Sequence, residues 1–424
     1  MSRLGWDHLT GEDKANILRG IEDGVAYGGP YHVEFHPQDR CNVDCFFCST
    51  AALRGKDEIP MPRFEELLAE LREMGTRAIR LSGGGEPLFH RKIESFLGAV
   101  RASGLPIENL TTNGVLLRSN LAELLVGVCE QVTVSLNTAD EQTYATMMQT
   151  NVRNFQRVVD NVRGLVAAKR RRKAKHPHVK LQFLVWKENF RQIPEMYRLA
   201  REAGVDSILF NGLASLPPEK WMTAAETEEM MALYEEILRI DEYRKIDVIN
   251  SFEQDISEQV TQIGARIGEE RKALSTPRRL AQTLLRDDFT LREKIDHYRS
   301  QRRVHAIKTA NEGLGTHCLI GWHSMLVRST GLVAPCCLIQ GKELGNVYRQ
   351  SVREVWYGEP YNRFRAELYR ILRQRSAWEH DEAADETVTP LCGPQGNCPI
   401  GSFYYYPDTP FLRTFNGVLR GLDP

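Results

Sequence analysis

The sequence predicts an α/β fold, in which an open, partial (β/α)6 barrel is followed by a smaller cysteine-bearing domain. Three observations support this fold class. Short apolar runs alternate with amphipathic helical stretches from residue 32 to about residue 217. Such alternation is typical of a parallel sheet built from βα units. The segment 218–310 is helical in pattern and heavily charged, and the turn-rich sequence after it carries five of the nine cysteines.

A strand is expected wherever an apolar run is bounded by turn residues. Six such runs occupy 31–35, 78–82, 107–112, 131–136, 180–185 and 207–211. Helical periodicity lies between them at 64–75, 93–104 and 193–204, and Gly104 and Gly204 stand where helices commonly end. Six units are fewer than the eight of a complete barrel. We therefore expect an open barrel with its ligand site at the carboxyl ends of the strands.

The domain boundaries are predicted from the same changes of pattern. Residues 1–31 form an N-terminal segment, 32–217 the partial barrel, 218–310 a charged helical linker or insert, 311–405 the cysteine-bearing domain and 406–424 a tail. The basic run 169–180 has no interleaved aromatic residues. A solvated helix end is therefore preferred there over a nucleic-acid patch.

The composition excludes several classes of partner. The 424 residues include 55 basic and 56 acidic side chains, so no bulk charge attracts nucleic acid or an anionic membrane. No apolar run is long enough for a spanning helix, and the first residues lack the apolar core of a secretory signal. A cytoplasmic protein is expected. Its cysteines are then interpreted as metal ligands or reactive thiols.

A compact cysteine triplet follows the first predicted strand. Cys41, Cys45 and Cys48 have C-x3-C-x2-C spacing in the loop that leaves this strand. A partial zinc site is one interpretation, but structural zinc takes four protein ligands, commonly in C-x2-C pairs. Three thiolates in one loop fit better to three irons of a four-iron cluster. One iron is then left open for a bound molecule, as in catalytic metal sites.

This triplet, after the first strand of a six-fold βα barrel, resembles the radical S-adenosylmethionine (SAM) enzymes. The resemblance implies a radical SAM core, in which the amino and carboxylate groups of SAM chelate the open iron. It also implies that Phe47, directly before Cys48, contacts the adenine.

Polar residues at the ends of the next strands match other parts of the family pattern. The resemblance assigns Gly84, Gly85 and Glu86, in "LSGGGEP", to the motif that holds the methionine amino group. Asn113 follows the third strand, and Ser135 and Asn137 stand where relatives bond the ribose hydroxyls. Each of these could equally be a turn residue. Glu188 and Asn189, after the fifth strand, are further candidates.

A second cysteine group lies near the C-terminus and comprises Cys318, Cys336, Cys337, Cys392 and Cys398. Gly331 allows a hairpin turn that would bring Cys318 and Cys336 together on adjacent strands. Four thiolates complete a cluster without an open iron, and a structural zinc site is the alternative. The remaining cysteine, Cys129, lies in an apolar run and is expected to be a buried small side chain.

The segment around this group resembles the auxiliary-cluster extension of the superfamily, the SPASM or shorter twitch domain. The full SPASM pattern has seven cysteines and two clusters, whereas this chain keeps only C-x5-C of its last run. One auxiliary [4Fe–4S] cluster is therefore expected, with Cys318, Cys336, Cys392 and Cys398 as ligands. Cys337 would then pack beside the cluster, or act as an extra ligand or a hydrogen-atom donor.

The resemblance implies reductive cleavage of SAM to a 5′-deoxyadenosyl radical, which takes hydrogen from a substrate. A one-electron reductant such as flavodoxin or ferredoxin is the expected partner. About 30 residues precede the first strand, which is short for the peptide-recognition domain of peptide-modifying relatives. A small polar substrate, such as a sugar, aminocyclitol or nucleoside, is therefore favoured.

Several alternatives remain open. Radical modification of a peptide or protein is the second hypothesis for the activity. A non-catalytic iron–sulfur electron carrier is disfavoured, because it needs neither an open iron nor the G-G-E loop. His36, His90 and His323 are possible substrate contacts, although a surface or capping role is preferred for each.

Overall fold

The structure, a computed structural model, describes residues 6–212, 220, 222–240, 246–251, 319–337 and 342–378. The strands of these ranges form one sheet in the order β10-β9-β8-β1-β2-β3-β4-β5-β6-β7. The strands are β1 (His32–Phe35), β2 (Ala78–Leu81), β3 (Ile107–Thr112), β4 (Gln131–Ser135), β5 (His178–Val185), β6 (Ser207–Gly212), β7 (Asp247–Ser251), β8 (Ser324–Val327), β9 (Leu332–Ala334) and β10 (Gly345–Asn346).

Helices α2 to α7 connect the strands from β1 to β6, α1 precedes β1, and α12 to α14 belong to the C-terminal part. The bounds of the helices are as follows. They are α1 (Gly11–Asp23), α2 (Met61–Glu73), α3 (Ile93–Ser103), α4 (Ser119–Leu125), α5 (Glu141–Met148), α6 (Arg153–Arg171), α7 (Ile193–Ala203), α8 (Ala224–Ile240), α12 (Ile320–His323), α13 (Val352–Trp356) and α14 (Glu359–Trp378). Single 3-10 turns are η1 (Trp6–His8), η2 (Ala51–Leu53), η3 (Pro87–Phe89) and η4 (Phe190–Gln192). Gly104 and Gly204 end α3 and α7 with φ of 74°, as their positions in the sequence predict.

The six predicted strands are β1 to β6, and each pairs in parallel with the next. The predicted open α/β barrel is therefore confirmed. The sheet is larger than six strands, however. β7 lies inside the segment expected to be a helical linker and pairs in parallel with β6, while β8 pairs in parallel with β1 at the other edge.

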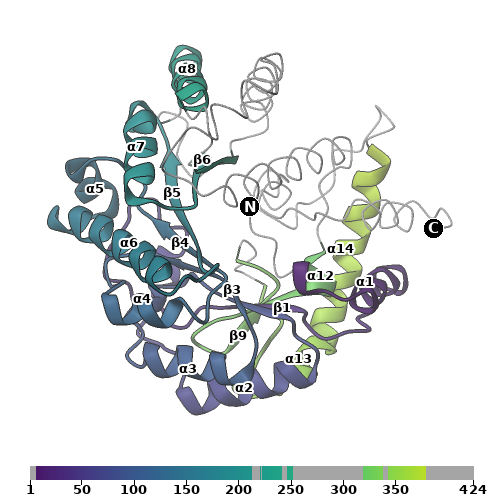
Figure 1. Ribbon diagram of the computed structural model, residues 1–424. Coiled ribbons are helices and arrows are strands. Elements are labelled where there is room, and N and C mark those ends of the chain that lie inside the picture. Colours follow the sequence, from purple (N-terminus) through teal and green to yellow (C-terminus); the bar gives the residue numbers. More distant parts are fainter. Residues whose placement is uncertain are drawn as a thin grey trace, which may run out of the picture.

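The two faces of the sheet differ in chemistry. Phe35 of β1 points to the helices, because its ring lies 5.3 Å from that of Phe64 on α2 in an edge-on contact. Successive side chains of a strand alternate between faces, so His32 and Glu34 point the other way. Figure 1 shows α2 to α7 along the outer side of the curved sheet. The inner side therefore carries polar residues. A parallel sheet that is buried on both faces usually has apolar side chains on both, so these polar residues need another explanation.

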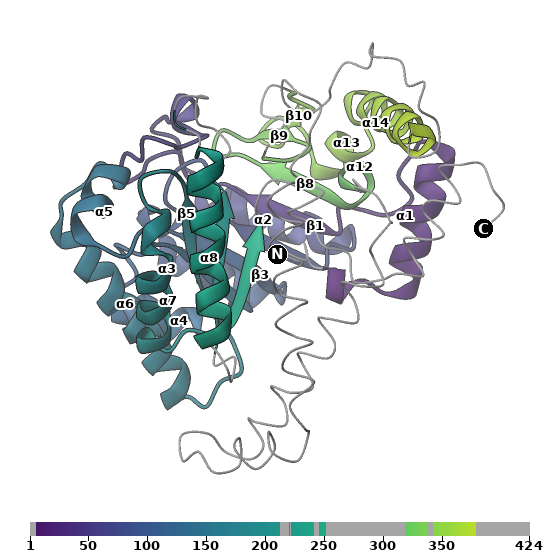
Figure 2. The same ribbon diagram turned by 90° about the horizontal axis from the view of Figure 1, so that it is seen from above.

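The C-terminal elements pack against the N-terminal helix, as Figure 2 shows for α1, α12 and α14. Trp356 of α13 donates its indole N–H to the Gly28 carbonyl at 2.8 Å. Gly331, with φ of 78°, lies in the turn between β8 and β9, where the sequence predicts a hairpin. This hairpin continues the barrel sheet, so the cysteines after β9 are tied to β1.

Two side chains of the basic run at the end of α6 form ion pairs. Lys169 pairs with Asp206 at 2.8 Å, and Arg171 pairs with Glu123 at 2.6 Å. The preference for a solvated helix end is consistent with these contacts. None of the helices in the described ranges is long and apolar enough to cross a membrane.

Candidate functional site

The cysteine triplet lies in the loop between β1 and η2, and this loop rests on the end of α5. The backbone N–H groups of Asp44 and Phe46 donate to the carbonyls of Met148 and Met147, at 3.0 and 3.2 Å. The Cys45 Sγ lies 3.5 Å from the Met148 Sδ. The three thiols are half-buried. The loop is therefore anchored before any metal binds.

The electrostatics of the loop oppose free thiolates. Burial raises the pKa of Cys41, and it raises the pKa of Cys45 to about 12. Three thiolates are thus held together only if a metal supplies positive charge. No set of three or more His, Cys, Asp or Glu side chains in the described ranges converges on a point that would hold a single metal ion. A four-iron cluster places its thiolates on separate irons, so it does not need such convergence.

Arg54 is a charged neighbour that the sequence analysis missed. Its guanidinium donates to the Val43 carbonyl at 3.2 Å and to the Asp44 carboxylate at 2.5 Å. Burial by itself would lower the pKa of Arg54, but the Cys48 side chain, and negative charge on Cys48 and Cys41 when they are thiolates, raise it. A cation there offsets negative charge on a cysteine-bound cluster. Its position six residues after the last cysteine belongs to no recognisable motif, so the sequence alone did not single it out.

The glycine loop after β2 packs directly on the loop that leads to Cys41. The Gly85 N–H donates to the Gln38 carbonyl at 2.8 Å, and the Glu86 N–H donates to the Arg40 carbonyl at 2.9 Å. A Cβ on Gly85 would lie 2.0 Å from the Arg40 carbonyl oxygen, and Gly84 has φ of 71°. Glycine is therefore required by the contact between the two loops. This steric reason for glycine is separate from the role in holding the methionine amino group that the family resemblance assigns to the motif.

The additional glycine of "LSGGGEP" accommodates a histidine. A Cβ on Gly83 would lie 2.5 Å from the His36 Nε2. His36 Nε2 lies 3.4 Å from the Glu34 carboxylate, which also accepts from the Ser82 hydroxyl. Burial by itself would raise the pKa of Glu34, but the bond with His36 and the charge of Arg80 hold it at about 2. A charged, buried carboxylate thus lies just below the glycine loop.

Glu86 is buried and bonded to neutral donors. Its carboxylate accepts from the Asn113 N–H at 2.7 Å, the Thr112 hydroxyl at 2.6 Å and the Leu88 N–H at 3.1 Å. Burial raises its pKa, although these donors lower it. Its carboxylate has about four acceptor positions, so one is left for a further donor. An ammonium group would bring the positive charge that this buried carboxylate lacks among its bonded neighbours.

Asn113 bridges the glycine loop and the cysteine loop. Its Nδ2 donates to the Asn42 Oδ1 at 2.8 Å and lies 3.8 Å from the Cys41 Sγ. Its Oδ1 accepts from the Val115 N–H at 3.0 Å. The structure therefore brings Asn113 to a predicted cluster ligand.

The end of β4 carries the predicted ribose contacts. Ser135 is half-buried, whereas Asn137 is 1% exposed with φ of 63°. The Asn137 Oδ1 is buried without a hydrogen-bond partner among the described residues. Glu188 is exposed, and Asn189 is buried with its amide bonded to backbone groups. These last two candidates do not share one environment.

An aromatic group borders the cysteine loop. The rings of Phe47 and Phe46 are 5.3 Å apart in an edge-on contact, and the Trp186 ring lies 5.3 Å from Phe46. The Lys220 ammonium lies 5.6 Å from the Phe46 ring centre. Phe47 is thus presented beside Cys48 by aromatic packing. Trp186, which follows β5, was missed because tryptophan at a strand end has many structural roles.

The three candidate histidines are all buried, so the expectation of a surface role is wrong. His90 has the capping role, because its Nδ1 accepts from the Lys92 N–H at 3.2 Å. His323 lies beside the Ser324 hydroxyl at 2.7 Å and stacks on His32. Burial lowers the pKa of His323 to about 3, so its ring is neutral. His36 faces Glu34, as described above.

The C-terminal cysteine group is described only in part. Cys336 is 4% exposed directly after β9, and Cys337 is half-buried. Cys318, Cys392 and Cys398 lie outside the described residues. Cys129 is buried, as expected for a small apolar side chain.

The residues at the strand ends fit a cluster and a SAM molecule. Within the described ranges, the donor set offers three thiols, a buried carboxylate without a cationic partner at Glu86, and a buried oxygen without a hydrogen-bond partner at Asn137. Thiolates hold iron, a carboxylate accepts from an ammonium group, and an amide oxygen accepts from a hydroxyl.

Comparison with known protein families agrees with this fit. Residues 35–231 match the radical SAM superfamily, and residues 318–393 match the SPASM iron–sulfur cluster-binding domain. Both matches follow the predicted domain order.

Several curated proteins are similar to part of the chain. A probable GTP 3′,8-cyclase of Sulfurisphaera tokodaii is 29% identical over 40% of this chain and 51% of its own length. A probable GTP 3′,8-cyclase of Methanopyrus kandleri is 26% identical over 60% of this chain and 86% of its own length. The chain spans about half the length of the first of these relatives.

Two solved structures share the fold. Streptococcus suis SuiB bound to S-adenosylmethionine has a TM-score of 0.56 at 16% identity, over 83% of this chain and 71% of that chain. Native anSMEcpe with bound AdoMet has a TM-score of 0.52 at 14% identity, over 78% of this chain and 82% of that chain. The triplet loop, the strand-end residues and the two domain matches lead to one conclusion: this chain belongs to the radical SAM superfamily, is an enzyme that uses an iron–sulfur cluster and SAM, and carries a C-terminal SPASM iron–sulfur domain.

Proposed function

We propose that this enzyme abstracts hydrogen from a small polar substrate, of the sugar, aminocyclitol or nucleoside type, in a biosynthetic pathway. The reaction would be a dehydrogenation, a dehydration or an epimerisation. The observation that carries the proposal is the chemistry of the inner face of the sheet, which is built from hydrogen-bonding side chains. Such a surface fits a ligand with many hydroxyl or amine groups.

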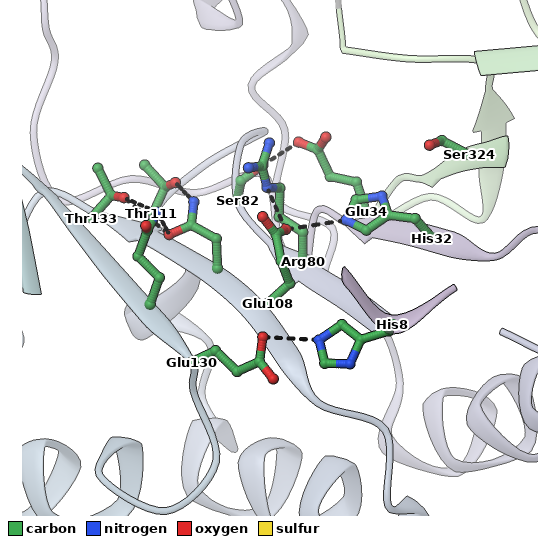
Figure 3. Close-up of polar contacts among 12 residues, drawn as sticks. His8, His32, Glu34, Arg80, Ser82, Glu108, Thr111, Glu130, Thr133 and Ser324 are labelled. Atoms are coloured by element: carbon green, nitrogen blue, oxygen red, sulfur yellow. Dashed lines mark hydrogen bonds and ion pairs between the residues drawn. The ribbon is translucent and has the colours of Figure 1, made fainter. Parts of the chain in front are cut away.

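Charged groups line β1 to β3 on this face. His32 and Arg80 both approach the Glu108 carboxylate, at 3.3 and 3.6 Å, and Figure 3 draws these contacts. Glu34 lies on the same face, one step along β1. A ligand that entered here would exchange hydrogen bonds with these groups.

Neutral polar groups continue the surface across β3 and β4. The Asn109 Oδ1 accepts from the Thr133 hydroxyl and the Gln131 amide, both at 3.0 Å. The Asn109 Nδ2 donates to the Thr111 hydroxyl at 3.1 Å. Hydroxyl and amide groups can rearrange to serve a polyhydroxylated molecule as well as each other.

The charges on the described strands are nearly balanced. Arg80 and Lys180 are opposed by Glu34, Glu108 and Asp247, and burial lowers the pKa of Lys180 to about 8. Binding of a triphosphate requires several cations aimed at its oxygens. The balance therefore supports a substrate of small net charge over GTP, on which the named relatives act.

The roles of the site residues follow from their positions. Cys41, Cys45 and Cys48 would hold the open cluster, and Glu86 would accept from the methionine ammonium. Phe47 would lie against adenine, and Ser135 and Asn137 would meet the ribose. Together the bound cluster and SAM supply a radical that abstracts hydrogen. The chain's own task is to orient the substrate and exclude water.

The C-terminal domain would hold one auxiliary [4Fe–4S] cluster through Cys336 and its partners Cys318, Cys392 and Cys398. Anaerobically reconstituted protein should then contain about eight irons per chain, because each cluster holds four. Replacement of Cys337 by alanine should leave SAM cleavage intact and block turnover if this thiol donates hydrogen. Loss of auxiliary iron would instead identify it as a ligand.

The experiment that tests the substrate class follows deuterium. Reduced, reconstituted enzyme is incubated with SAM and deuterated sugars, aminocyclitols or nucleosides, and 5′-deoxyadenosine is analysed by mass spectrometry. We expect deuterium transfer from a compound of this group. GTP and peptides form separate arms, because radical modification of a peptide or protein is the alternative. Transfer only from GTP or only from a peptide would refute the proposed substrate class.

A further inference from the structure

The turn after β4 holds an asparagine in a conformation that non-glycine residues rarely adopt. Asn137 has φ of 63° and is 1% exposed. Its Nδ2 has only a weak contact, with the Met148 Sδ at 3.8 Å. Its Oδ1 is buried without a partner among the described residues. Asparagine adopts the left-handed region more readily than other non-glycine residues, but that region is still less favourable than ordinary backbone. An orphaned buried oxygen is unfavourable as well, so neighbouring contacts are needed to hold this arrangement.

The backbone of this residue is fixed on both sides by β5 and the turn that follows it. The Asn137 N–H donates to the Gln182 carbonyl at 3.0 Å. The Asn137 carbonyl accepts from the Asn189 Nδ2 at 3.1 Å. The first bond belongs to the strand pair, whereas the second depends on one side chain.

The side-chain amide hydrogens of Asn189 are both used within the chain. Asn189 is fully buried, and its Nδ2 also donates to the Leu184 carbonyl at 2.7 Å. Its Oδ1 accepts from the Trp186 N–H at 2.8 Å. The amide thus ties the turn after β5 to the end of β4. Donation from the Asn189 Nδ2 to SAM would require breaking one of its two bonds to backbone carbonyls.

We propose that Asn189 is a positioning residue for SAM, which holds Asn137 in the left-handed conformation so that its Oδ1 can accept from a ribose hydroxyl. Asn189 itself does not touch the cofactor. The inference rests on the proposed role of Asn137 at the ribose. It explains why a strained residue with an orphaned oxygen is held so firmly at this strand end.

The test measures SAM affinity rather than turnover. Full-length, reconstituted enzyme with its cluster oxidised is studied by anaerobic equilibrium dialysis with labelled SAM and with its 2′-deoxy and 3′-deoxy analogues. Asn189→Ser should bind SAM about tenfold more weakly than wild type. For one of the two deoxy analogues, the affinities of Asn189→Ser and of wild type should agree within about twofold. That analogue lacks the ribose hydroxyl from which the Asn137 Oδ1 accepts, so the position of Asn137 no longer affects its binding.

The same substitution of Asn189, made in an Asn137→Gly variant, separates a positioning role from general destabilisation of the protein. Glycine adopts positive φ freely, so Asn137→Gly removes the side chain without needing the restraint. Asn189→Ser should then have no further effect on SAM affinity in the Asn137→Gly background. Such coupling is what a double-mutant cycle measures. An additional tenfold loss there would overturn the inference.

Asn346 provides a matched control. Its amide also bridges two backbone groups, since it donates to the Thr330 carbonyl at 3.3 Å and accepts from the Tyr348 N–H at 2.8 Å. It lies on β10, away from β4 and β5. Asn346→Ala should bind SAM as wild type does. If Asn346→Ala and Asn189→Ser lost SAM affinity equally, both losses would be due to lower protein stability, and the positioning role of Asn189 would be refuted.

The remaining outcomes are also decisive. If Asn137→Gly binds SAM and both analogues as wild type does, the proposed ribose role of Asn137 fails. If Asn137→Gly is weak but Asn189→Ser is normal, only the present inference fails. If Asn189→Ser is not recovered with iron, Asn189→Asp keeps the acceptor for the Trp186 N–H and loses the donor. The same loss of affinity, specific for the ribose hydroxyl, is then expected of it.

Discussion

Replacement of Gly85 by alanine tests whether the two site loops depend on close backbone packing. The new Cβ would lie 2.0 Å from the Arg40 carbonyl oxygen, and real Cβ contacts essentially never fall below 3.0 Å. The loops must therefore separate by at least 3.0 − 2.0 = 1.0 Å. Arg40 directly precedes Cys41, so the displacement is passed to the first cluster cysteine.

The cost follows from the bonds that hold the loops together. Separation breaks the bonds from the Gly85 N–H to Gln38 and from the Glu86 N–H to Arg40, and each contributes about 1 kcal/mol. If the loops must close again to bind SAM, affinity falls by about 2 kcal/mol, or about thirtyfold. Glu86 moves with the loop, so its carboxylate is displaced as well.

The assay compares iron content, SAM affinity and formation of 5′-deoxyadenosine in anaerobically reconstituted protein. Gly98→Ala is the control, because a Cβ there meets nothing within 4 Å. Gly98 lies in α3, where alanine stabilises by up to about 1 kcal/mol relative to glycine. Gly85→Ala with wild-type SAM affinity and cleavage would refute the argument from loop contact.

Three further predictions address the cluster, the inner face and the N-terminal helix. Cys48→Ala should lose about four irons per chain and all SAM cleavage, whereas Cys129→Ala should keep its iron and its SAM cleavage. SAM cleavage by Cys48→Ala would show that Cys48 is not a ligand of the cluster. The pKa of Glu34 is about 2 in the folded protein, against an ordinary value of 4.5. The ionised Glu34 therefore stabilises the fold fully above pH 4.5, and this contribution is lost as the pH falls toward 2. At about 1.4 kcal/mol per pKa unit, the lowered pKa of Glu34 contributes about 3 kcal/mol to the free energy of unfolding. Thermal midpoints of Glu34→Gln should therefore fall less steeply than those of wild type across that interval, and parallel curves would contradict the assignment. Thr10→Ala removes the capping box at the start of α1, and should lower the free energy of unfolding by about 1 kcal/mol with SAM cleavage unchanged. A loss of cleavage would instead couple α1 to the active site.

Local patterns were enough to predict the architecture. The six strands, the helix ends at Gly104 and Gly204 and the hairpin turn at Gly331 were all indicated by residues next to one another in the sequence. Such features depend on periodicity and on backbone preferences, which a single segment carries. The addition of β7 and β8 at the sheet edges was missed. Edge pairing depends on which segments meet in space.

Contacts between distant segments decided most of what is new about the site. Asn189 was a ligand candidate in the sequence, and the structure shows that its Nδ2 donates to the carbonyls of Asn137 and Leu184. Arg54 and Trp186 carried no recognisable motif. The expectation that His36 and His323 lie on the surface was wrong, because the barrel encloses both.

By itself, the sequence determined the family, the three-cysteine loop and the six βα strands, because these are properties of residue type and spacing. Only the tertiary structure decided what the glycines of "GGGEP" are for. Gly85 faces the carbonyl of Arg40 and Gly83 faces the ring of His36, each about 45 residues distant in the chain. Steric contact depends on distances in space, and no spacing along the chain specifies those.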